Sequence, residues 1–228
     1  GTSFDIEAHH KLARKAAQES IVLLKNEDNI LPLQPGTKVA VIGDFAQTPR
    51  YQGAGSSLVN PAKQPEAVLN EIGNCGLEMV AFEQGYRRNK KSDAKLIERA
   101  KEAAKKAEVV LIFAGLDEIS ESEGLDRTHM NMPQAQNMLI DEISTVNPNV
   151  IVVLSAGSAG EMPWYSYVRG IVHGYLGGQA GASAMLNVLT GKICPSGKLN
   201  ETYPIHCEDN PVLHYYPSKE RSSEYRES

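Results

Sequence analysis

Short apolar runs alternate with amphipathic segments along most of the chain. Five runs of about six residues are almost continuously apolar and rich in β-branched side chains, a pattern typical of buried strands. Before and between these runs, apolar residues recur every three or four positions, as they do in amphipathic helices. The pattern predicts strands at 38–43, 77–82, 109–114, 150–155 and 170–175, and helices at 6–25, 64–72, 92–107, 133–146, 162–167 and 181–190.

This alternation predicts an α/β fold: a doubly wound, mostly parallel sheet of five to six strands with helices on both faces. With right-handed crossovers and the strand order 2-1-3-4-5, the strands at 38–43 and 109–114 would be neighbours at the switch point of the sheet. The loops that follow these two strands would then face one crevice. We expect an entry helix and connector over 1–35, the α/β domain over 36–204 and a truncated C-terminal extension over 205–228.

Composition narrows the class of protein. Hydrophobic residues make up 41% of the 228 residues and charged residues 22%, so the chain can bury a sizeable core. The formal net charge of −5 argues against a nucleic-acid partner, and no apolar stretch reaches the length of a membrane span. The three cysteines lie far apart and form no CxxC pair, so we expect neither a disulfide framework nor a structural metal. A cytoplasmic, reducing compartment is slightly favoured, and secretion stays open.

Carboxylates crowd the segment that follows the predicted strand at 109–114. We call residues 117–127 the carboxylate loop; it contains Asp117, Glu118, Glu121, Glu123 and Asp126. Like charges held close together raise the pKa of a carboxyl, which can then act as a general acid near neutral pH. Taken alone, such a loop is more often only a solvated acidic surface.

A second distinctive loop, residues 50–59, follows the strand at 38–43 and is rich in glycine and serine. We call it the glycine–serine loop. It lacks the third glycine of a dinucleotide fingerprint and the lysine of a phosphate loop, so a nucleotide site is disfavoured. Backbone N–H groups and hydroxyls at Gly55, Ser56 and Ser57 could instead bind a sugar, with a plain glycine-rich turn as the alternative.

Other candidate chemistry is weaker. Segment 155–160 lacks the G-x-S-x-G spacing of a serine hydrolase. We expect His9 and His10 to be exposed on the first helix and His173 to be a core histidine. Trp164 fits the core better than a sugar-stacking platform. A receiver-type domain is disfavoured, because Asp44 is the single acidic residue after the first strand and no lysine follows the fifth.

Several motifs, taken in order, resemble the C-terminal α/β-sandwich domain of glycoside hydrolase family 3, a family of many β-glucosidases and β-xylosidases. The most specific segment is PSGKL at 195–199, with Thr202 and Pro204. The other motifs are ESIVLLKNE at 19–27 with LPL at 31–33, VAVIG at 39–43, GAGSS at 53–57, EGLDR at 123–127 with Met132, Pro133 and Gln136, PNVIVVL at 148–154, MPW at 162–164 and GGQ at 177–179.

The resemblance implies a retaining enzyme, with no cofactor, that hydrolyses terminal β-linked sugars of oligosaccharides or glycosides through a covalent intermediate. The nucleophile would be an Asp on a separate (β/α)8 barrel domain of the same parent protein. The domain described by this sequence would supply the acid/base. The motif places that role at Glu123, with Glu121 as the fallback.

The resemblance also assigns supporting roles within the two loops. Ser56 would contact the sugar in the −1 subsite, with Ser57 and Gly55 as weaker candidates. Asp126 and Arg127 would form an ion pair that shapes the carboxylate loop.

The predicted barrel does not fit into this chain. A barrel of about 250 residues and an α/β domain together exceed its length, and the nucleophile motif is not found in the sequence. We therefore expect the chain to be part of a longer enzyme and to be inactive by itself. The alternative is a non-catalytic carbohydrate-binding or scaffold module whose carboxylate loop is an acidic surface.

Overall fold

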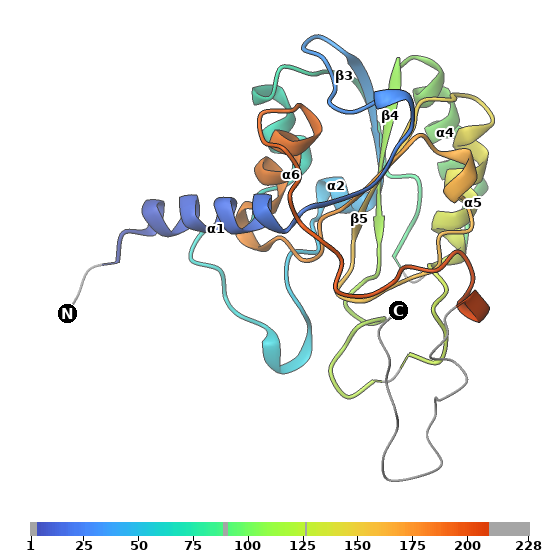
Figure 1. Ribbon diagram of the computed structural model, residues 1–228. Helices are drawn as coiled ribbons and strands as arrows, with labels where there is room; N and C mark the ends of the chain where they lie inside the picture. Colours follow the sequence, from blue (N-terminus) through green and yellow to red (C-terminus); the bar gives the residue numbers. More distant parts are fainter. Residues whose placement is uncertain (1–3, 89–90, 126, 210–228) are drawn as a thin grey trace.

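A six-stranded mixed sheet forms the centre of the protein (Figure 1). The computed structural model describes residues 4–88, 91–125 and 127–209. The strands follow the order β1-β6-β5-β4-β2-β3, with β1 antiparallel to β6 and the other pairs parallel. The α/β fold and the 2-1-3-4-5 order of the five predicted strands are confirmed. The strands are β1 (Val22–Asn26), β2 (Lys38–Ile42), β3 (Glu78–Glu83), β4 (Val109–Gly115), β5 (Val150–Ser155) and β6 (Gly170–His173).

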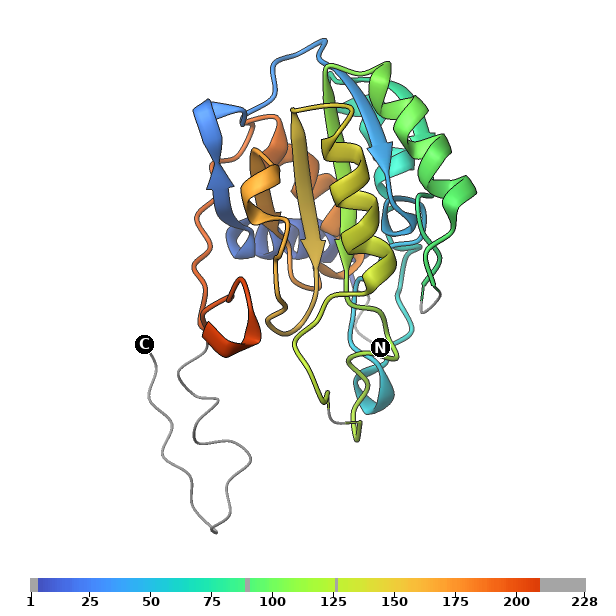
Figure 2. The same cartoon turned by 90° about the vertical axis from the view of Figure 1, so that its right-hand side faces the viewer.

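Helices cover both faces of the sheet (Figure 1, Figure 2). One face is covered by α1, α2, α3 and α6, and the other by α4 and α5. The α-helices are α1 (Ile6–Ser20), α2 (Asp44–Gln47), α3 (Val68–Glu71), α4 (Ala94–Lys105), α5 (Gln134–Ser144) and α6 (Gly181–Leu189). Short 3-10 turns lie at Glu27–Asn29, Gly55–Ser57, Ile72–Asn74, Tyr165–Tyr167, Gly178–Ala180 and Cys207–Asp209.

Each face of the sheet has its own hydrophobic core. Every residue of β4 is buried, and its side chains alternate between the two cores. Val110 and Ile112 pack with α4 and α5, whereas Leu111 and Phe113 pack with α1 and α6. Burial of one such aliphatic or aromatic side chain stabilises the fold by about 1.5–3 kcal/mol. A strand covered on both faces must be apolar at nearly every position, which explains the continuous apolar runs in the sequence.

The chain enters the sheet differently from the prediction. The helix predicted over 6–25 ends at Ser20, and residues 22–26 form the edge strand β1. Adjacent β-branched side chains at Ile21 and Val22 favour extended structure. Val22 pairs with His173 of β6, so β1 covers an edge of the sheet that would otherwise be open.

Two other helices are shorter than predicted. Segment 64–72 is α-helical only over Val68–Glu71, and segment 162–167 forms only the 3-10 turn Tyr165–Tyr167. Proline lies at positions 65 and 163. Because proline lacks an N–H and disfavours a helical conformation of the preceding residue, both helices start later than the apolar spacing suggests.

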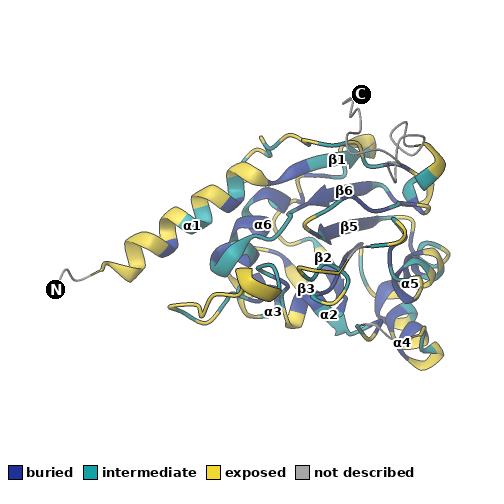
Figure 3. Ribbon diagram, turned by 90° about the horizontal axis from the view of Figure 1, so that it is seen from below, coloured by how far each residue is buried: buried dark blue, intermediate teal, exposed yellow. Residues whose placement is uncertain are grey.

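Helix α1 projects from the body of the domain (Figure 3). Near its C-terminal end, Gln18 accepts a hydrogen bond from Asn187 of α6 at 2.7 Å. His9 is exposed as predicted, but the exposure predicted for His10 is wrong: its Nε2 lies 2.8 Å from Glu66 Oε1, in a buried contact with the segment before α3. Among the described residues, no helix is long and apolar enough to cross a membrane.

Candidate functional site

The glycine–serine loop and the carboxylate loop meet at the carboxyl edge of the sheet. They follow β2 and β4, which are adjacent. The two strands end so close together that a Cβ atom at Gly43 would lie 2.2 Å from the carbonyl oxygen of Phe113. A parallel bridge joins Ala54 to Ser122, and Figure 2 shows the two loops side by side. The convergence predicted from the topology is confirmed.

Glu123 lies at the exposed tip of the carboxylate loop and contacts the glycine–serine loop. The backbone N–H of Ser56 donates to Glu123 Oε2 at 2.9 Å, and the Ser56 hydroxyl donates to the same oxygen. Gly55 has a φ of +79°, and a Cβ atom there would lie 2.9 Å from Glu123 Cβ. Glycine is therefore required at position 55 for this approach. The Ser57 hydroxyl instead donates to the carbonyl of Ala54 within its own loop, at 3.1 Å.

Glu121, two residues earlier, is held from several sides. Its carboxylate forms an ion pair with Arg50, whose side chain is 1% exposed, while the Glu121 side chain is 10% exposed. The backbone N–H of Gly157 donates to Glu121 Oε2 at 2.9 Å, and the Ser158 hydroxyl donates to Oε1. Glu121 thus connects the carboxylate loop both to the glycine–serine loop and to residues 156–160, which follow β5 and which we call the β5 loop.

The pKa of each of these two carboxyls is lowered below its usual range. For Glu123, the hydroxyl and the backbone N–H of Ser56 stabilise the charged form and lower its pKa. For Glu121, burial raises the pKa, but hydrogen bonds from Ser158, Gly157 and Arg50 outweigh burial. The prediction that crowding raises the pKa is wrong for both carboxyls, because each one has its own hydrogen-bond donors.

Two other carboxylates of the loop also have separate partners. Asp117 is buried, and its Oδ1 accepts the backbone N–H of Ser120 at 2.8 Å. Glu118 forms an ion pair with Arg88 at 3.1 Å. The four described carboxylates of the loop are therefore individually bonded side chains and not a cluster of like charges.

Arg127 ends the carboxylate loop and binds the β5 loop. It donates hydrogen bonds to the Ser158 hydroxyl and to the Ala159 carbonyl, each at 2.9 Å. Asp126 lies outside the described residues, and so does the ion pair predicted between Asp126 and Arg127. The described contacts of Arg127 join the end of the carboxylate loop to the β5 loop.

The sequence patterns did not indicate three residues of this network: Arg50, Gly157 and Ser158. A positional signal was available, because Arg50 follows β2 and the other two follow β5, at the edge where ligands bind in such sheets. Their contacts with Glu121 could not be predicted, since Arg50 and Glu121 are 71 positions apart.

Trp164 and His173 belong to the core, as predicted. Trp164 is fully buried, and its Nε1 donates to Asn137 Oδ1 at 2.9 Å. Burial lowers the pKa of His173 to about 4, and its Nε2 is hydrogen-bonded to the Tyr203 hydroxyl. Neither side chain is placed to bind a sugar.

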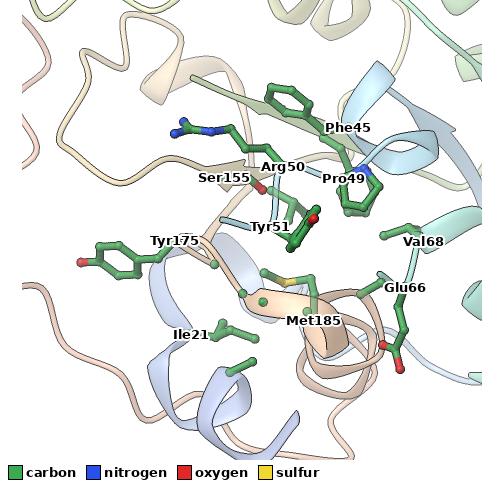
Figure 4. Close-up of a pocket in the computed structure, with 18 residues that line it drawn as sticks. Ile21, Phe45, Pro49, Arg50, Tyr51, Glu66, Val68, Ser155, Tyr175 and Met185 are labelled. Atoms are coloured by element: carbon green, nitrogen blue, oxygen red, sulfur yellow. The ribbon is translucent and has the colours of Figure 1, made fainter. Parts of the chain in front are cut away.

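A cavity of about 60 Å³ lies beside Arg50, between the sheet edge and helices α1 and α6 (Figure 4). Its walls are mainly apolar, with Phe45, Val68 and Met185 among them. The Arg50 guanidinium points away from these walls. The cavity has space for a few water molecules at most and is too small for a sugar ring. Within the described ranges, no group of three or more His, Cys, Asp or Glu side chains is arranged to hold a metal ion.

Known proteins resemble the chain over nearly its whole length. The family model described as Glycosyl hydrolase family 3 C-terminal domain matches residues 21–228. The chain is 46% identical over 227 residues to thermostable beta-glucosidase B of Acetivibrio thermocellus, which covers 98% of this chain and 30% of the relative. It is 42% identical over 235 residues to an exo-alpha-(1->6)-L-arabinopyranosidase of Bifidobacterium breve, and the match covers 98% of this chain and 31% of that relative.

Solved structures share the fold. A GH3 beta-glucosidase from Bifidobacterium adolescentis superimposes with a TM-score of 0.89 at 42% identity, covering 97% of this chain and 32% of that one. Beta-glucosidase 3B from Thermotoga neapolitana gives a TM-score of 0.78 at 28% identity, and the match covers 94% of this chain and 33% of that one. The chain spans 30% to 33% of the length of these relatives.

Proposed function

The chain belongs to glycoside hydrolase family 3 and corresponds to the C-terminal domain of that family. We propose that it supplies the acid/base of a retaining β-glycosidase of the β-glucosidase type. In this proposal Glu123 is the acid/base, and Ser56 contacts the sugar in the −1 subsite. A (β/α)8 barrel elsewhere in the parent protein supplies the Asp nucleophile and the rest of the sugar site. The chain by itself carries one of the two carboxyl groups that the reaction needs.

The contact between Ser56 and Glu123 is the observation that carries this proposal. It brings a hydroxyl donor and a carboxylate, from loops far apart in sequence, to one exposed place at the carboxyl edge. Of the two candidate carboxylates, Glu123 is exposed, whereas both oxygens of Glu121 are occupied, by the buried Arg50, the partly buried Ser158 and the backbone N–H of Gly157. A proton donor must reach the substrate, so Glu123 fits the role better than Glu121.

The proposed reaction has two steps. In the first, the Asp of the barrel forms a bond to the anomeric carbon while the glycosidic C–O bond breaks, and protonated Glu123 gives its proton to the departing oxygen. In the second, water attacks the anomeric carbon and the bond to Asp breaks, while the Glu123 carboxylate takes the proton of the water. Both steps use the same oxygen-bearing side chain, first as acid and then as base.

The hydrogen bonds of Ser56 suggest how Glu123 changes its protonation state. They stabilise its charged form, which is the form required of the base. If the Ser56 hydroxyl donated its hydrogen bond to a sugar hydroxyl instead of to Glu123, part of this stabilisation would be lost. A negatively charged Asp close to Glu123 would raise its pKa further, towards the protonated form required of the acid.

The two relatives described above suggest where the sugar is selected. This domain is 46% identical to its counterpart in a protein named as a beta-glucosidase and 42% identical to that in a protein named as an arabinopyranosidase. Similar identity to both is expected if the domain supplies shared acid/base chemistry. The choice of sugar then lies mainly with the remaining two thirds of the parent protein.

Replacement of Glu123 in the full-length enzyme tests the proposal. We expect Glu123→Ala to lower kcat by about 10²- to 10⁴-fold on aryl β-glucosides with poor leaving groups. The loss should be smaller on dinitrophenyl glucosides, which need little protonation, and azide should partly restore turnover by replacing the base-assisted attack of water. Glu118→Ala is the matched control, because Glu118 lies in the same loop but pairs with Arg88.

Three results would overturn the proposal. If Glu123→Ala keeps normal turnover on poor leaving groups, the acid/base lies elsewhere. If the chain alone hydrolyses the glucosides and Glu123→Gln abolishes that activity, the nucleophile is in this chain after all. Unchanged turnover in both Glu123→Ala and Glu121→Ala, together with sugar binding by the chain alone, would indicate a carbohydrate-binding module instead.

A further inference from the structure

The glycine–serine loop and the carboxylate loop are connected at three successive points. The Arg50 guanidinium pairs with Glu121, residue 54 forms a bridge with residue 122, and Ser56 binds Glu123. The partners advance in the same direction along both loops. The Arg50–Glu121 pair is buried at the inner end of this series, and the Ser56–Glu123 contact is exposed at the outer end.

The β5 loop supports the carboxylate loop on both sides of Glu123. Before Glu123, Glu121 accepts hydrogen bonds from Gly157 and Ser158. After it, Arg127 donates to Ser158 and to the Ala159 carbonyl. The Ser158 hydroxyl is therefore shared by the two flanks of the loop. The loop has fixed ends and an exposed tip.

From this arrangement we propose that Glu121 is a positioning residue. By joining Arg50 to the β5 loop, it fixes the place and direction of the Glu123 carboxylate relative to Ser56. This inference rests on the proposed acid/base role of Glu123. Glu121 itself does not touch the substrate and transfers no proton.

The bonding of Glu121 explains why it acts as a carboxylate and not as a proton donor. Both Glu121 oxygens accept hydrogen bonds, Oε2 from the Gly157 N–H and the Arg50 guanidinium and Oε1 from the Ser158 hydroxyl, so a proton on either oxygen would displace a donor. Protonation would leave the Arg50 charge, on a side chain that is 1% exposed, without its counter-ion. A buried charge without a partner is strongly unfavourable, so Glu121 stays ionised while the reaction proceeds.

The buried Arg50–Glu121 ion pair fixes the positions of the two loops more than it stabilises the fold. The desolvation of two charges offsets much of their attraction, and apolar side chains of similar size are often as stable in such places. An Arg–carboxylate pair is directional, however, and Arg50 also donates to the Leu116 carbonyl at 2.7 Å. Arg50 therefore binds the chain directly before the carboxylate loop and again at Glu121, two residues before the proposed acid/base. A displacement of a reacting group by about 1 Å can cost about 100-fold in rate.

A double-mutant cycle in the full-length enzyme tests this inference. The variants are Glu121→Gln, Glu123→Gln and the double variant, with Glu118→Gln as the control from the same loop. We expect Glu121→Gln to lower kcat on 4-nitrophenyl glucoside by about 10- to 100-fold, with a much smaller change in KM. In the Glu123→Gln background the same substitution should cost less than about 3-fold, because the side chain that it positions no longer transfers a proton.

Two further readouts separate positioning from folding. The substitution Ser158→Ala removes one donor to Glu121 and one acceptor of Arg127 but keeps the Arg50–Glu121 pair, so it should act in the same direction with a smaller loss. Azide should restore turnover to Glu123→Ala but not to Glu121→Gln, in which the Glu123 carboxylate still fills its place. Should Glu121→Gln fail to fold, Ser158→Ala in the presence and absence of Glu123→Gln gives the same cycle.

The possible outcomes are distinct. Equal losses from Glu121→Gln in both backgrounds would overturn the positioning role, because the residue would then act independently of Glu123. No loss in the Glu123-intact enzyme would overturn it as well. Azide rescue of Glu121→Ala, together with normal turnover by Glu123→Gln, would overturn the proposed function itself and make Glu121 the acid/base.

Discussion

Glu121 and Glu123 are separated by one residue, yet their surroundings are opposite. Glu121 is largely buried, paired with Arg50 and bound to the β5 loop. Glu123 is exposed and is bound by Ser56, from the outer part of the neighbouring loop. The partners of each carboxylate, and not the number of carboxylates around it, therefore set its surroundings and its pKa.

The carboxylate loop thus consists of a support, held through Glu121 and Arg127, and a tip that carries Glu123. The support is determined within this domain, because all of its partners lie on loops at one edge of the sheet. The tip can be completed by another surface, because Glu123 is exposed. A loop that ended in a buried tip could not serve a site shared with a second domain.

Stability of the isolated chain gives the largest expected contrast between the two carboxylates. Glu121→Ala should lower the free energy of unfolding by about 3 kcal/mol, because it leaves the buried Arg50 charge unpaired. Glu123→Ala should change it by less than about 0.5 kcal/mol, as is usual for exposed positions. Urea unfolding of both variants measures the difference. Equal effects would show that the loop is not divided into support and tip.

Two glycines allow a sharper test of the tip. Gly55 and Gly124 have φ values of +79° and +78°, so alanine at either costs about 1–2 kcal/mol of backbone strain. A Cβ at Gly55 would lie 2.9 Å from Glu123 Cβ, whereas at Gly124 nothing lies within 4 Å. Gly55→Ala should therefore cost about 1 kcal/mol more than Gly124→Ala in urea unfolding. A larger loss in Gly124→Ala would contradict the close packing of Gly55 against Glu123.

Much of the fold could be predicted from the sequence, since a buried strand must be apolar along its whole length. β4 and β5 show this directly, and the strand order followed from known preferences of parallel sheets. β1 was missed because it is an edge strand that is only partly buried, and its apolar residues continue the spacing of α1. The β-branched pair Ile21 and Val22 is a weak local signal for a strand, and pairing with β6 decides between the two structures.

The site could be predicted as two converging loops, but its internal bonds could not. Topology brings the loops together, and the motif indicated Glu123 and Ser56. The partner of Glu121 depends on how Arg50 turns after β2, which no spacing in the sequence reveals. The pKa prediction was wrong for the same reason: crowding in sequence is not crowding in space, because each carboxylate found a separate donor.

The smallest expected effect concerns the pKa of Glu123. Ser56→Ala removes the hydroxyl donor but keeps the backbone N–H, so the pKa of Glu123 should rise part of the way towards its usual range. Ser57→Ala is the matched control, because the Ser57 hydroxyl binds Ala54. An NMR titration of the Glu123 side chain in the isolated chain measures both shifts.

The linked effect on stability has a definite sign. A carboxyl whose pKa is lowered in the folded state stabilises the fold at pH values above its unfolded pKa of about 4.3. This stabilisation is lost as the pH falls through the folded pKa. Ser56→Ala should therefore be less stable than the unmodified chain at pH 7, and this part of the difference should vanish at a pH below both pKa values. A difference that persists unchanged in acid would mean that Ser56 stabilises the loop by packing. Ser56 would then not be the cause of the lowered pKa of Glu123.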